Sequence, residues 1–287
     1  DIIDGVAGKL GTPYGVKSYK PYHSGGEDFL QNYLGMIGIP IDLVPEFPFD
    51  AEMVILTEQA KKDPDLVDKI QQRLNNGKDV IITSGLLNAL QDKGIRNIVN
   101  LEYTSRKSIV SDFLSGGKII TGETPVVIPQ IQYNTNDSWE ILSGMDGGLG
   151  WPLLHMAKVA DATMYVIVIP ENFADLYNLP VEVLNKIREI SCKSMGIAIK
   201  GDSKVSVFLY DNNTFVLESF NDKPVEMEVV LSEKSRWITD LQTEENLIAE
   251  IIPPVKYGNR VLSQEKFRYK ITLGSHSFRG FKIEYKK

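Results

Sequence analysis

Hydrophobic and polar positions follow two different periods along the chain. Between residue 15 and about residue 195, continuous apolar runs alternate with segments whose apolar residues recur every three or four positions. After Gly201 the apolar positions recur every second residue, which is typical of half-buried strands. The sequence therefore predicts two domains: an α/β domain over residues 1–200 and a small antiparallel β-sandwich over residues 201–287.

The α/β prediction depends on five apolar runs and on the helical segments between them. Strands are expected near residues 15–19, 39–44, 53–57, 79–83 and 163–169. The clearest helix has Asp63 as its cap and Pro64 at its first position, and Gly77 marks its end. Strands that alternate with helices predict βαβ units and hence a doubly wound, mostly parallel sheet with helices on both faces.

Two further stretches predict antiparallel pairing. Residues 101–150 hold short β-rich runs broken by Gly and Pro, so we expect an irregular excursion or a small antiparallel addition. In the C-terminal part, "SKVSVFLYDNNTFVLESF" places two β-rich runs around Asp211-Asn212-Asn213, which is a hairpin signal.

The composition of the 287 residues narrows the classes of function. A formal net charge of -7 argues against a nucleic-acid partner, because binding a polyanion requires a basic face. Cys192 is the single cysteine, so no internal disulfide can form and a structural thiol is expected. No run reaches the ~20 apolar residues of a membrane-spanning helix. The chain begins with Asp1, which indicates a removed signal peptide or a piece of a longer protein, and we favour the second.

The stretch "SYKPYHSGGEDF", residues 18–29, follows the first expected strand, where open α/β sheets bind ligands. Its Gly pair matches neither phosphate-binding pattern, and Glu27 would repel an anion. Two interpretations remain. Either the loop caps the next helix while its acids complement the helix dipole, which we favour, or Tyr22, His23 and their polar neighbours form a ligand pocket.

The stretch "VIITSGLL" leads from a strand through a tight turn into a helix, which is the geometry of a nucleophile elbow. Thr83 or Ser84 would be the nucleophile and His23 its base, because His155 has an apolar context typical of a packed histidine and His276 belongs to the other domain. The favoured alternative is that Ser84 caps the short helix. We therefore predict no catalytic residue, and keep Ser84 and His23 as the weaker candidates. No metal-ligand spacing such as HxxxH or CxxC occurs, so neither a metal nor a cofactor is expected.

Two tryptophans flank a glycine-rich loop in "NDSWEILSGMDGGLGWPLLH". Trp139 and Trp151 could stack on a sugar or anchor an interface, where Trp is enriched, and we favour an interface or core position. The predicted ligand or interface residues are therefore Tyr22, His23, Glu27, Trp139 and Trp151.

Several segments are together similar to the trimerisation domain of β-galactosidases: "GVKSY", "GEDFLQNYLGMIGIPIDLVP", "MVILTE" and "DPDLVDKIQQRLNNGKDVIIT". Residues 53–83 resemble the family's apolar strand, helix ending near a Gly and second apolar strand, and "KVADATMYVIVIP" resembles a later element. The stretch "YGVKSYKPYHSGGEDFLQNYLGMIGIPIDLVPEFP" is also similar to C-terminal regions of large, uncharacterised glycoside hydrolases of bacteria.

The resemblance implies a flavodoxin-like module, related to class I glutamine amidotransferases, which follows a catalytic (β/α)8 barrel and precedes a β-sandwich. Thr83-Ser84 stands where an amidotransferase carries its nucleophilic cysteine, and the downstream His-x-Glu has no match near "VIVIPENF". These departures favour a scaffold that has lost its chemistry.

From this resemblance we expect a non-catalytic accessory and oligomerisation region of a glycoside hydrolase that acts on carbohydrates. The implied partners are an upstream catalytic domain, further copies of the chain and a carbohydrate, and the resemblance alone implies a secreted or periplasmic location. The alternatives are a stand-alone amidotransferase-like hydrolase and a carbohydrate-binding module.

Overall fold

A computed structural model describes residues 2–133, 137–258 and 260–285. The chain divides into two compact units. We call residues 16–33 and 41–187 the mixed-sheet unit, and residues 1–15, 34–40 and 188–287 the sandwich unit. The two domains expected from the sequence, residues 1–200 and 201–287, stay a prediction, because compactness does not show which stretch folds on its own.

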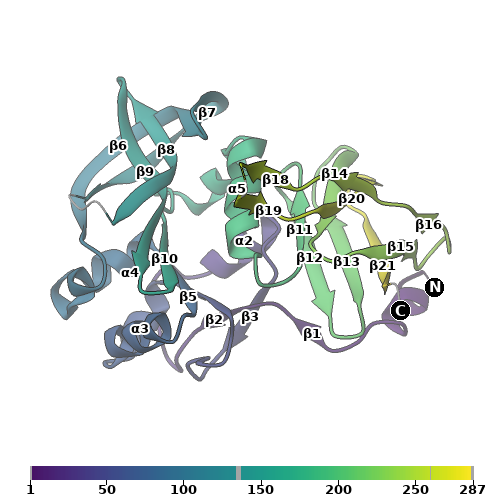
Figure 1. Ribbon diagram of the computed structural model, residues 1–287, viewed down its shortest axis with the longest axis horizontal. Helices are drawn as coiled ribbons and strands as arrows, with labels where there is room; N and C mark the ends of the chain where they lie inside the picture. The colour runs from purple at the N-terminus through teal and green to yellow at the C-terminus, as the bar shows by residue number, and fades with distance from the viewer. Residues whose placement is uncertain (1, 134–136, 259, 286–287) are drawn as a thin grey trace. The chain divides into compact units, whose positions relative to one another are not determined.

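The mixed-sheet unit is built on one nine-stranded sheet in the order β3-β2-β4-β5-β10-β9-β8-β6-β7 (Figure 1). Five neighbouring strands run parallel: β3 (Ile41–Val44), β2 (Val16–Tyr19), β4 (Met53–Leu56), β5 (Asp79–Thr83) and β10 (Ala162–Ile167). They coincide with the five apolar runs, and the prediction that these runs share one sheet is confirmed. Every residue of β4 and β10 is buried, which explains why their sequences are apolar without alternation.

The other four strands of this sheet are antiparallel and long: β6 (Leu101–Ser115), β7 (Lys118–Tyr133), β8 (Ser138–Asp146) and β9 (Leu149–Val159). They form the antiparallel addition that was one of the two expectations for residues 101–150. Figure 1 shows them as extended ribbons continuing the sheet beyond β10.

The prediction of a flavodoxin-like, doubly wound, mostly parallel domain is wrong. The chain is 47% strand and 20% helix, and its large sheet is mixed. Gly and Pro in residues 101–133 suggested short broken strands, but β7 is an edge strand, where a proline can lack its N–H without breaking a ladder. Two register shifts between β6 and β7 absorb the remaining irregularity as bulges, so the strands continue through them.

Short helices connect the strands of the mixed-sheet unit. They are η1 (Glu58–Lys62), α3 (Leu66–Asn75), α4 (Ser84–Ala89), η2 (Gln91–Lys93), η3 (Ile95–Asn97) and η4 (Phe173–Asn178). Two further helices, α2 (Leu30–Met36) and α5 (Val181–Ser191), contribute residues to both units.

Two antiparallel sheets form the sandwich unit around one shared core. The first has the order β1 (Pro13–Tyr14), β12 (Val205–Tyr210), β13 (Thr214–Ser219), β21 (Phe278–Tyr285), β15 (Ser235–Asp240) and β16 (Asn246–Leu247). The second has the order β11 (Ile197–Lys200), β14 (Val225–Leu231), β20 (Lys266–Leu273) and β17 (Glu250–Ile252). Phe215 stacks on Phe281 inside this core, with ring centroids 5.1 Å apart.

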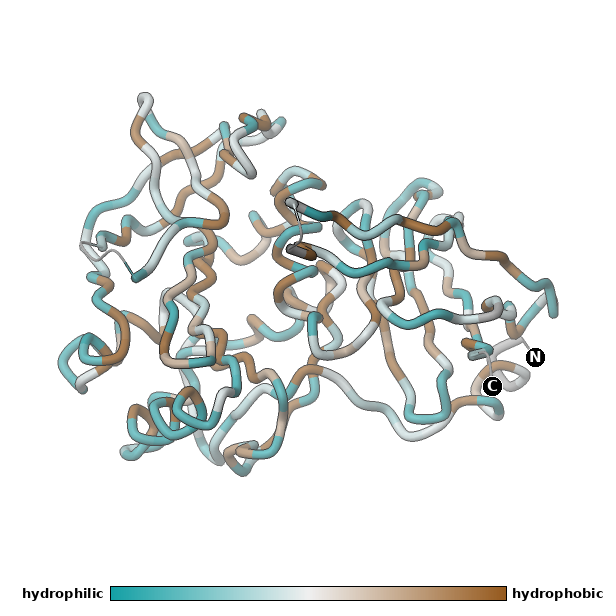
Figure 2. Tube along the Cα trace, in the orientation of Figure 1, coloured by the Kyte–Doolittle hydropathy of each residue, from teal (hydrophilic) through white to brown (hydrophobic). Residues whose placement is uncertain are grey.

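The remaining elements of the sandwich unit are the helix α1 (Ile2–Ala7) and a separate hairpin, β18 (Val255–Tyr257) and β19 (Arg260–Ser263). The predicted turn at Asp211-Asn212-Asn213 is confirmed, since β12 and β13 pair across it. Figure 2 shows hydrophobic segments gathered in the inner strands of each unit. Among the described residues, no helix is long and apolar enough to cross a membrane.

Candidate functional site

The candidate site lies at the carboxyl ends of three parallel strands. The chain leaves β2 for β3 on one side and then continues to β4 on the other side, so the strand order changes direction at β2. In open sheets such a switch point leaves a crevice that favours ligand binding. Here three segments follow the strand ends: the loop over residues 20–29 after β2, the start of η1 after β4, and the start of α4 after β5.

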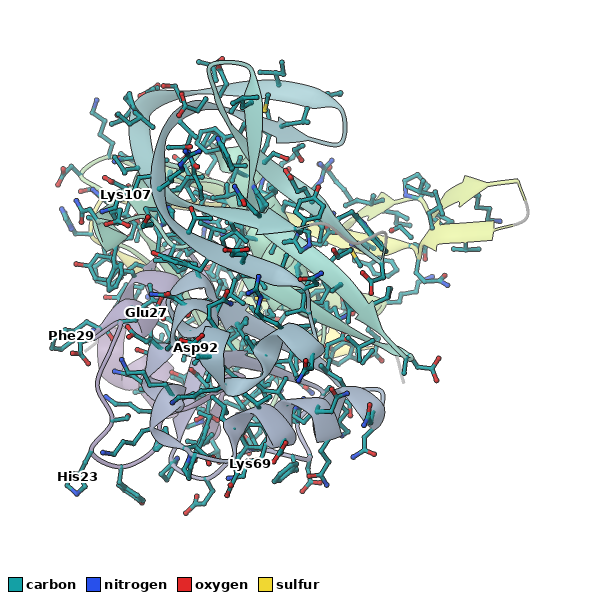
Figure 3. The ribbon with its side chains drawn as sticks, turned by 90° about the vertical axis from the view of Figure 1, so that its left-hand side faces the viewer. His23, Glu27, Phe29, Lys69, Asp92 and Lys107 are labelled. Atoms are coloured by element: carbon teal, nitrogen blue, oxygen red, sulfur yellow. The ribbon has the colours of Figure 1, made fainter. Side chains whose placement is uncertain are left out.

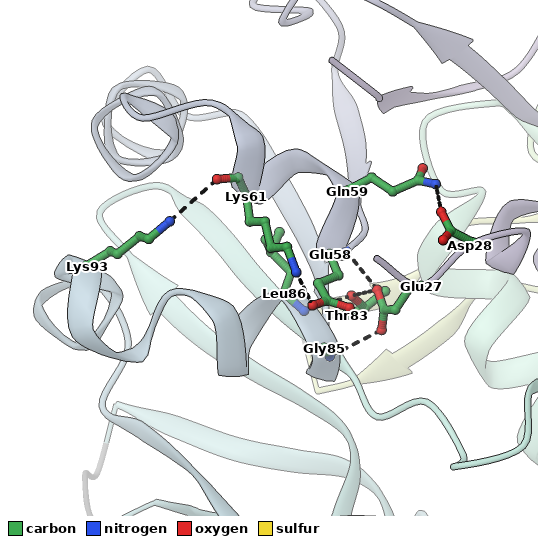
Figure 4. Close-up of polar contacts among 9 residues, drawn as sticks. All are labelled: Glu27, Asp28, Glu58, Gln59, Lys61, Thr83, Gly85, Leu86 and Lys93. Atoms are coloured by element: carbon green, nitrogen blue, oxygen red, sulfur yellow. Dashed lines mark hydrogen bonds and ion pairs between the residues drawn. The ribbon is translucent and has the colours of Figure 1, made fainter. Parts of the chain in front are cut away.

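The carboxylate of Glu27 joins these three segments (Figure 4). Its Oε2 accepts hydrogen bonds from the backbone N–H of Glu58 at 2.7 Å and from the Thr83 hydroxyl at 2.5 Å. Its Oε1 accepts from the backbone N–H of Gly85 at 3.2 Å. A Cβ at position 85 would lie 2.3 Å from that oxygen, so only glycine permits this approach.

Burial raises the pKa of Glu27 above its ordinary value, because the charged form loses its hydration. The hydrogen bonds from Thr83, Glu58 and Gly85 act in the opposite direction, since they favour the carboxylate, and the nearby Glu58 carboxylate raises the pKa further. Glu58 itself forms an ion pair with Lys61 at 2.5 Å. Glu27 thus combines a costly buried charge with donors placed to stabilise it.

A second set of side-chain contacts fixes the same loop to the end of β4. The buried Gln31 amide donates to Thr57 Oγ1 at 3.0 Å and to Gln59 Oε1 at 2.9 Å. Gln59 in turn donates to Asp28 Oδ1 at 3.1 Å. Sequence reasoning missed Gln31, Thr57, Glu58 and Gln59, although polar residues that directly follow an apolar strand were a signal for three of them.

The loop between β2 and α2 is strained. His23, Glu27 and Phe29 have φ values of 58°, 45° and 66°, in the left-handed region that residues with a Cβ rarely adopt. Tyr22, His23 and Phe29 are exposed, and Figure 3 shows His23 and Phe29 at the periphery while Glu27 lies further inside. Such strain persists only where surrounding contacts enforce it, and the hydrogen bonds of Glu27 supply them.

Ser84 and His23, the catalytic candidates from the sequence, do not pair as a nucleophile and its base among the residues that the structure describes. Ser84 is buried, and its Oγ accepts a hydrogen bond from the backbone N–H of Ile169 at 3.0 Å. No hydrogen bond joins Ser84 to His23 within the described part of the chain. Ser84 is also absent from the residues with positive φ, unlike the strained nucleophile of an elbow. The expected cap was Ser84, but the N-cap of α4 is Thr83, whose Oγ1 accepts from Leu86 N at 3.3 Å.

Trp139 and Trp151 lie at different positions along the β8–β9 hairpin. Trp139 is 44% exposed near the start of β8, and Trp151 is half-buried near the β8–β9 turn. They face Met156 and Gly144 respectively across the hairpin, about five strand positions apart, so they form two separate surfaces. Their role as ligand or interface residues, with that of Tyr22, His23 and Glu27, stays a prediction.

His155 and Cys192 are core groups, as predicted. Both ring nitrogens of His155 are buried without a hydrogen-bond partner, and burial lowers the pKa of this histidine to about 4. Burial raises the pKa of the Cys192 thiol to about 12, which leaves it unreactive. The described residues contain no group of three or more His, Cys, Asp or Glu side chains placed to hold a metal ion.

Comparison with known proteins assigns most of the chain. Residues 11–172 match the family described as "Uncharacterized protein SSO3021, second domain". The chain belongs to this family. Residues 196–283 match a second family, "Probable glycosyl hydrolase, C-terminal domain", which relates the chain to glycoside hydrolases. No curated protein matches the chain.

Two solved structures share the fold at low sequence identity. Alpha-L-fucosidase isoenzyme 2 from Paenibacillus thiaminolyticus superposes with a TM-score of 0.56, at 12% identity over 99% of this chain and 51% of that one. The E323A catalytic mutant of Gan42B, a GH42 beta-galactosidase from G. stearothermophilus, has a TM-score of 0.51 at 12% identity over 96% of this chain and 41% of that one. The chain therefore spans only about half, or less, of these proteins. The resemblance to glutamine amidotransferases is not carried by these matches.

Proposed function

We propose that the chain is a non-catalytic accessory and oligomerisation region of a larger glycoside hydrolase that acts on carbohydrates. The observation that carries the proposal is the Glu27 carboxylate at the switch point of the sheet. It takes up the backbone N–H groups of Glu58 and Gly85 and the Thr83 hydroxyl. The donors that could bind a ligand at the strand ends are thereby occupied by the chain itself.

The hydroxyl groups beside Glu27 are also committed. Thr83 and Glu27 have the composition of a nucleophile and its base, but Thr83 is buried and both donates to Glu27 and accepts from Leu86. Ser84 is buried and accepts from Ile169. A nucleophile must reach a substrate atom, so these contacts favour a structural role over acyl transfer.

The family matches support an accessory position. One match is named as a second domain and the other as a C-terminal domain, and the structural neighbours are about twice as long as this chain or longer. We propose an upstream catalytic domain as one partner. The exposed Trp139 on β8 is the surface proposed to contact that domain, since Trp often anchors an interface.

Turnover measurements test the non-catalytic proposal. The 287-residue chain is incubated with glutamine, a generic aryl ester and aryl glycosides, beside the variants Ser84→Ala and His23→Ala. We expect no turnover above buffer for any of the three proteins. Turnover by the unaltered chain that disappears in either variant would establish the stand-alone hydrolase instead.

A further inference from the structure

A hairpin of the sandwich unit exposes its apolar side chains. Residues 253–263, which we call the arm, contain β18 and β19, and these form a two-stranded sheet separate from the two sheets of the unit. Figure 3 shows the arm as the pale yellow hairpin that projects from its own unit. Val255, Val261 and Leu262 are 53%, 43% and 58% exposed. A two-stranded hairpin is marginally stable by itself in water, and clustered exposed apolar residues mark contact surfaces.

The charge of the arm is opposite to that of the rest of the chain. Residues 253–263 include Lys256 and Arg260 and no acidic residue, so the arm carries two positive charges. Since the chain carries -7 in total, the remaining residues carry a formal charge of -9. A second copy of this chain therefore presents an electrostatically complementary body to the arm.

One face of the arm combines both properties. Lys256 and Val261 are cross-strand partners, so their side chains share a face of the hairpin. That face offers an apolar group beside a cationic one. Val255, the residue before Lys256 along β18, points to the opposite face.

The sandwich unit also contains a pocket of matching chemistry, with a volume of 230 Å³. It lies on the face of the six-stranded sheet opposite the core, because Phe208, Val216 and Phe278 alternate with core residues along β12, β13 and β21. Leu10 and Tyr210 complete much of the apolar lining, and Glu218 is the charged residue among the described lining residues.

The size of this pocket indicates what it holds. Pockets for whole small-molecule ligands occupy roughly 300–1,000 Å³, and this one is smaller. An apolar side chain fits it better than a sugar ring with its many hydroxyl groups, because the lining provides few polar partners. Glu218 at the lining suits a cation beside that side chain.

We propose that the arm of one copy docks into this pocket of a second copy, with Val261 against the apolar lining and Lys256 toward Glu218. The arm and the pocket are different surfaces, and in the proposed dimer two copies exchange arms reciprocally, so that both pockets are filled. The inference deepens the proposed oligomerisation role and rests on it. In the dimer, apolar side chains of the arm become buried that are exposed in their own unit.

Light scattering coupled to size-exclusion chromatography tests the contact in the 287-residue chain. The unaltered chain should have a dimer mass. Val261→Glu on the arm and Phe208→Glu in the pocket should each weaken the dimer at least tenfold, because each puts a carboxylate into the apolar contact. Val255→Glu is the matched control: it makes the same substitution on the opposite face of the arm and should leave the mass unchanged.

A mixture of the two disruptive variants adds a stricter criterion. The Phe208→Glu chain keeps an intact arm and the Val261→Glu chain keeps an intact pocket, so a mixed dimer retains one complete contact. We expect dimer mass to reappear on mixing. All variants should keep the melting temperature of the unaltered chain, because the substituted side chains lie outside the shared core.

The outcomes separate this proposal from the function on which it rests. A dimer that survives Val261→Glu, or variants that fail to complement on mixing, overturns the arm contact and leaves oligomerisation standing. A monomeric unaltered chain overturns both the contact and the oligomerisation role. The turnover assay stays independent of either result.

Discussion

Glu27 is the residue with the most demanding surroundings at the strand-end site. A carboxylate offers acceptors at both oxygens, and here both oxygens face donors. Glu27→Gln turns one of these oxygens into an NH2 group that opposes a donor of Glu58, Thr83 or Gly85. An unsatisfied buried donor typically costs about 1–3 kcal/mol, so we expect a loss of that size in the free energy of unfolding by urea.

The neighbouring acid provides the control. Asp28 accepts a single hydrogen bond from Gln59 and is exposed, so Asp28→Asn retains an acceptor and should shift the unfolding midpoint little. Equal midpoints for Glu27→Gln and the unaltered chain would show that the carboxylate does not hold the three segments together.

His155 makes the stability of the chain depend on pH in a defined window. Its pKa falls from 6.5 in the unfolded chain to about 4 in the folded one, because burial disfavours the imidazolium. A lowered folded pKa means that the unfolded state takes up the proton first. Stability from this group is therefore complete above pH 6.5 and is lost as the pH falls toward 4, by about 3 kcal/mol in all.

Replacing His155 by leucine tests this sign. Neither ring nitrogen has a hydrogen-bond partner, so His155→Leu sacrifices no hydrogen bond and should change stability at pH 7 by less than about 1.5 kcal/mol. Between pH 6.5 and 4 the variant should lose less stability than the unaltered chain in urea titrations. If His155→Leu keeps the slope of the unaltered chain, another group causes the acid sensitivity.

Single residues were predictable where their own neighbours in sequence decide their environment. The apolar stretch "PLLHMAKV" was enough to place His155 in a core. The role of Glu27 was not, because its partners lie 31 to 58 residues away along the chain. Local pattern also suggested a helix cap for this loop, whereas distant hydrogen bonds hold it in left-handed backbone conformations.

At the scale of elements, the apolar runs identify the parallel strands, whereas Gly and Pro obscure the long antiparallel ones. A run such as "MVIL" is buried on both faces, so its composition alone indicates a central strand. The sequence pattern indicates strand breaks at Pro125 and Pro129, yet both residues lie inside β7 at the sheet edge. Whether a strand lies at an edge depends on the complete strand order, which no local window of sequence contains.

Arg188, near the end of α5, connects this helix to two other segments of the sandwich unit through hydrogen bonds. Its fully buried guanidinium donates to the carbonyl oxygens of Ile37 at 2.5 Å, Gly201 at 2.6 Å and Asp202 at 2.7 Å. Burial lowers its pKa to about 10, so it stays charged at neutral pH. Lysine cannot reproduce this fork of donors.

We therefore expect Arg188→Lys to lower the free energy of unfolding by about 3 kcal/mol or more, since hydrogen bonds from a charged donor are worth roughly 1.5–3 kcal/mol each. Arg96→Lys supplies the comparison, because Arg96 forms an exposed ion pair with Glu102 and should cost less than about 1 kcal/mol. Similar losses for the two variants in urea unfolding would contradict this connecting role of Arg188.

At the scale of the whole molecule, the two periods of the sequence separated a helix-containing region from an antiparallel one. That distinction survives in the two units. The sandwich unit also includes residues 1–15 and 34–40, which lie more than 140 residues before the rest of that unit in the sequence. Such long-range assembly is invisible to periodicity. The relation to glycoside hydrolases was predictable from resemblance, whereas the arm and the pocket were not, because exposure is a property of the folded surface.

The proposed partner surfaces also predict how Trp139 behaves. This residue is 44% exposed on β8, so Trp139→Ala removes little core packing and should change the free energy of unfolding by less than about 1 kcal/mol. Leu154→Ala, at a fully buried position of the neighbouring strand β9, should cost about 2–5 kcal/mol. If copies associate through the arm and pocket, Trp139→Ala should also leave the oligomer mass of this chain unchanged, since Trp139 belongs to neither surface. Thermal unfolding and light scattering on both variants decide the matter. A stable Trp139→Ala chain of reduced mass would instead make the β8–β9 face the contact between copies.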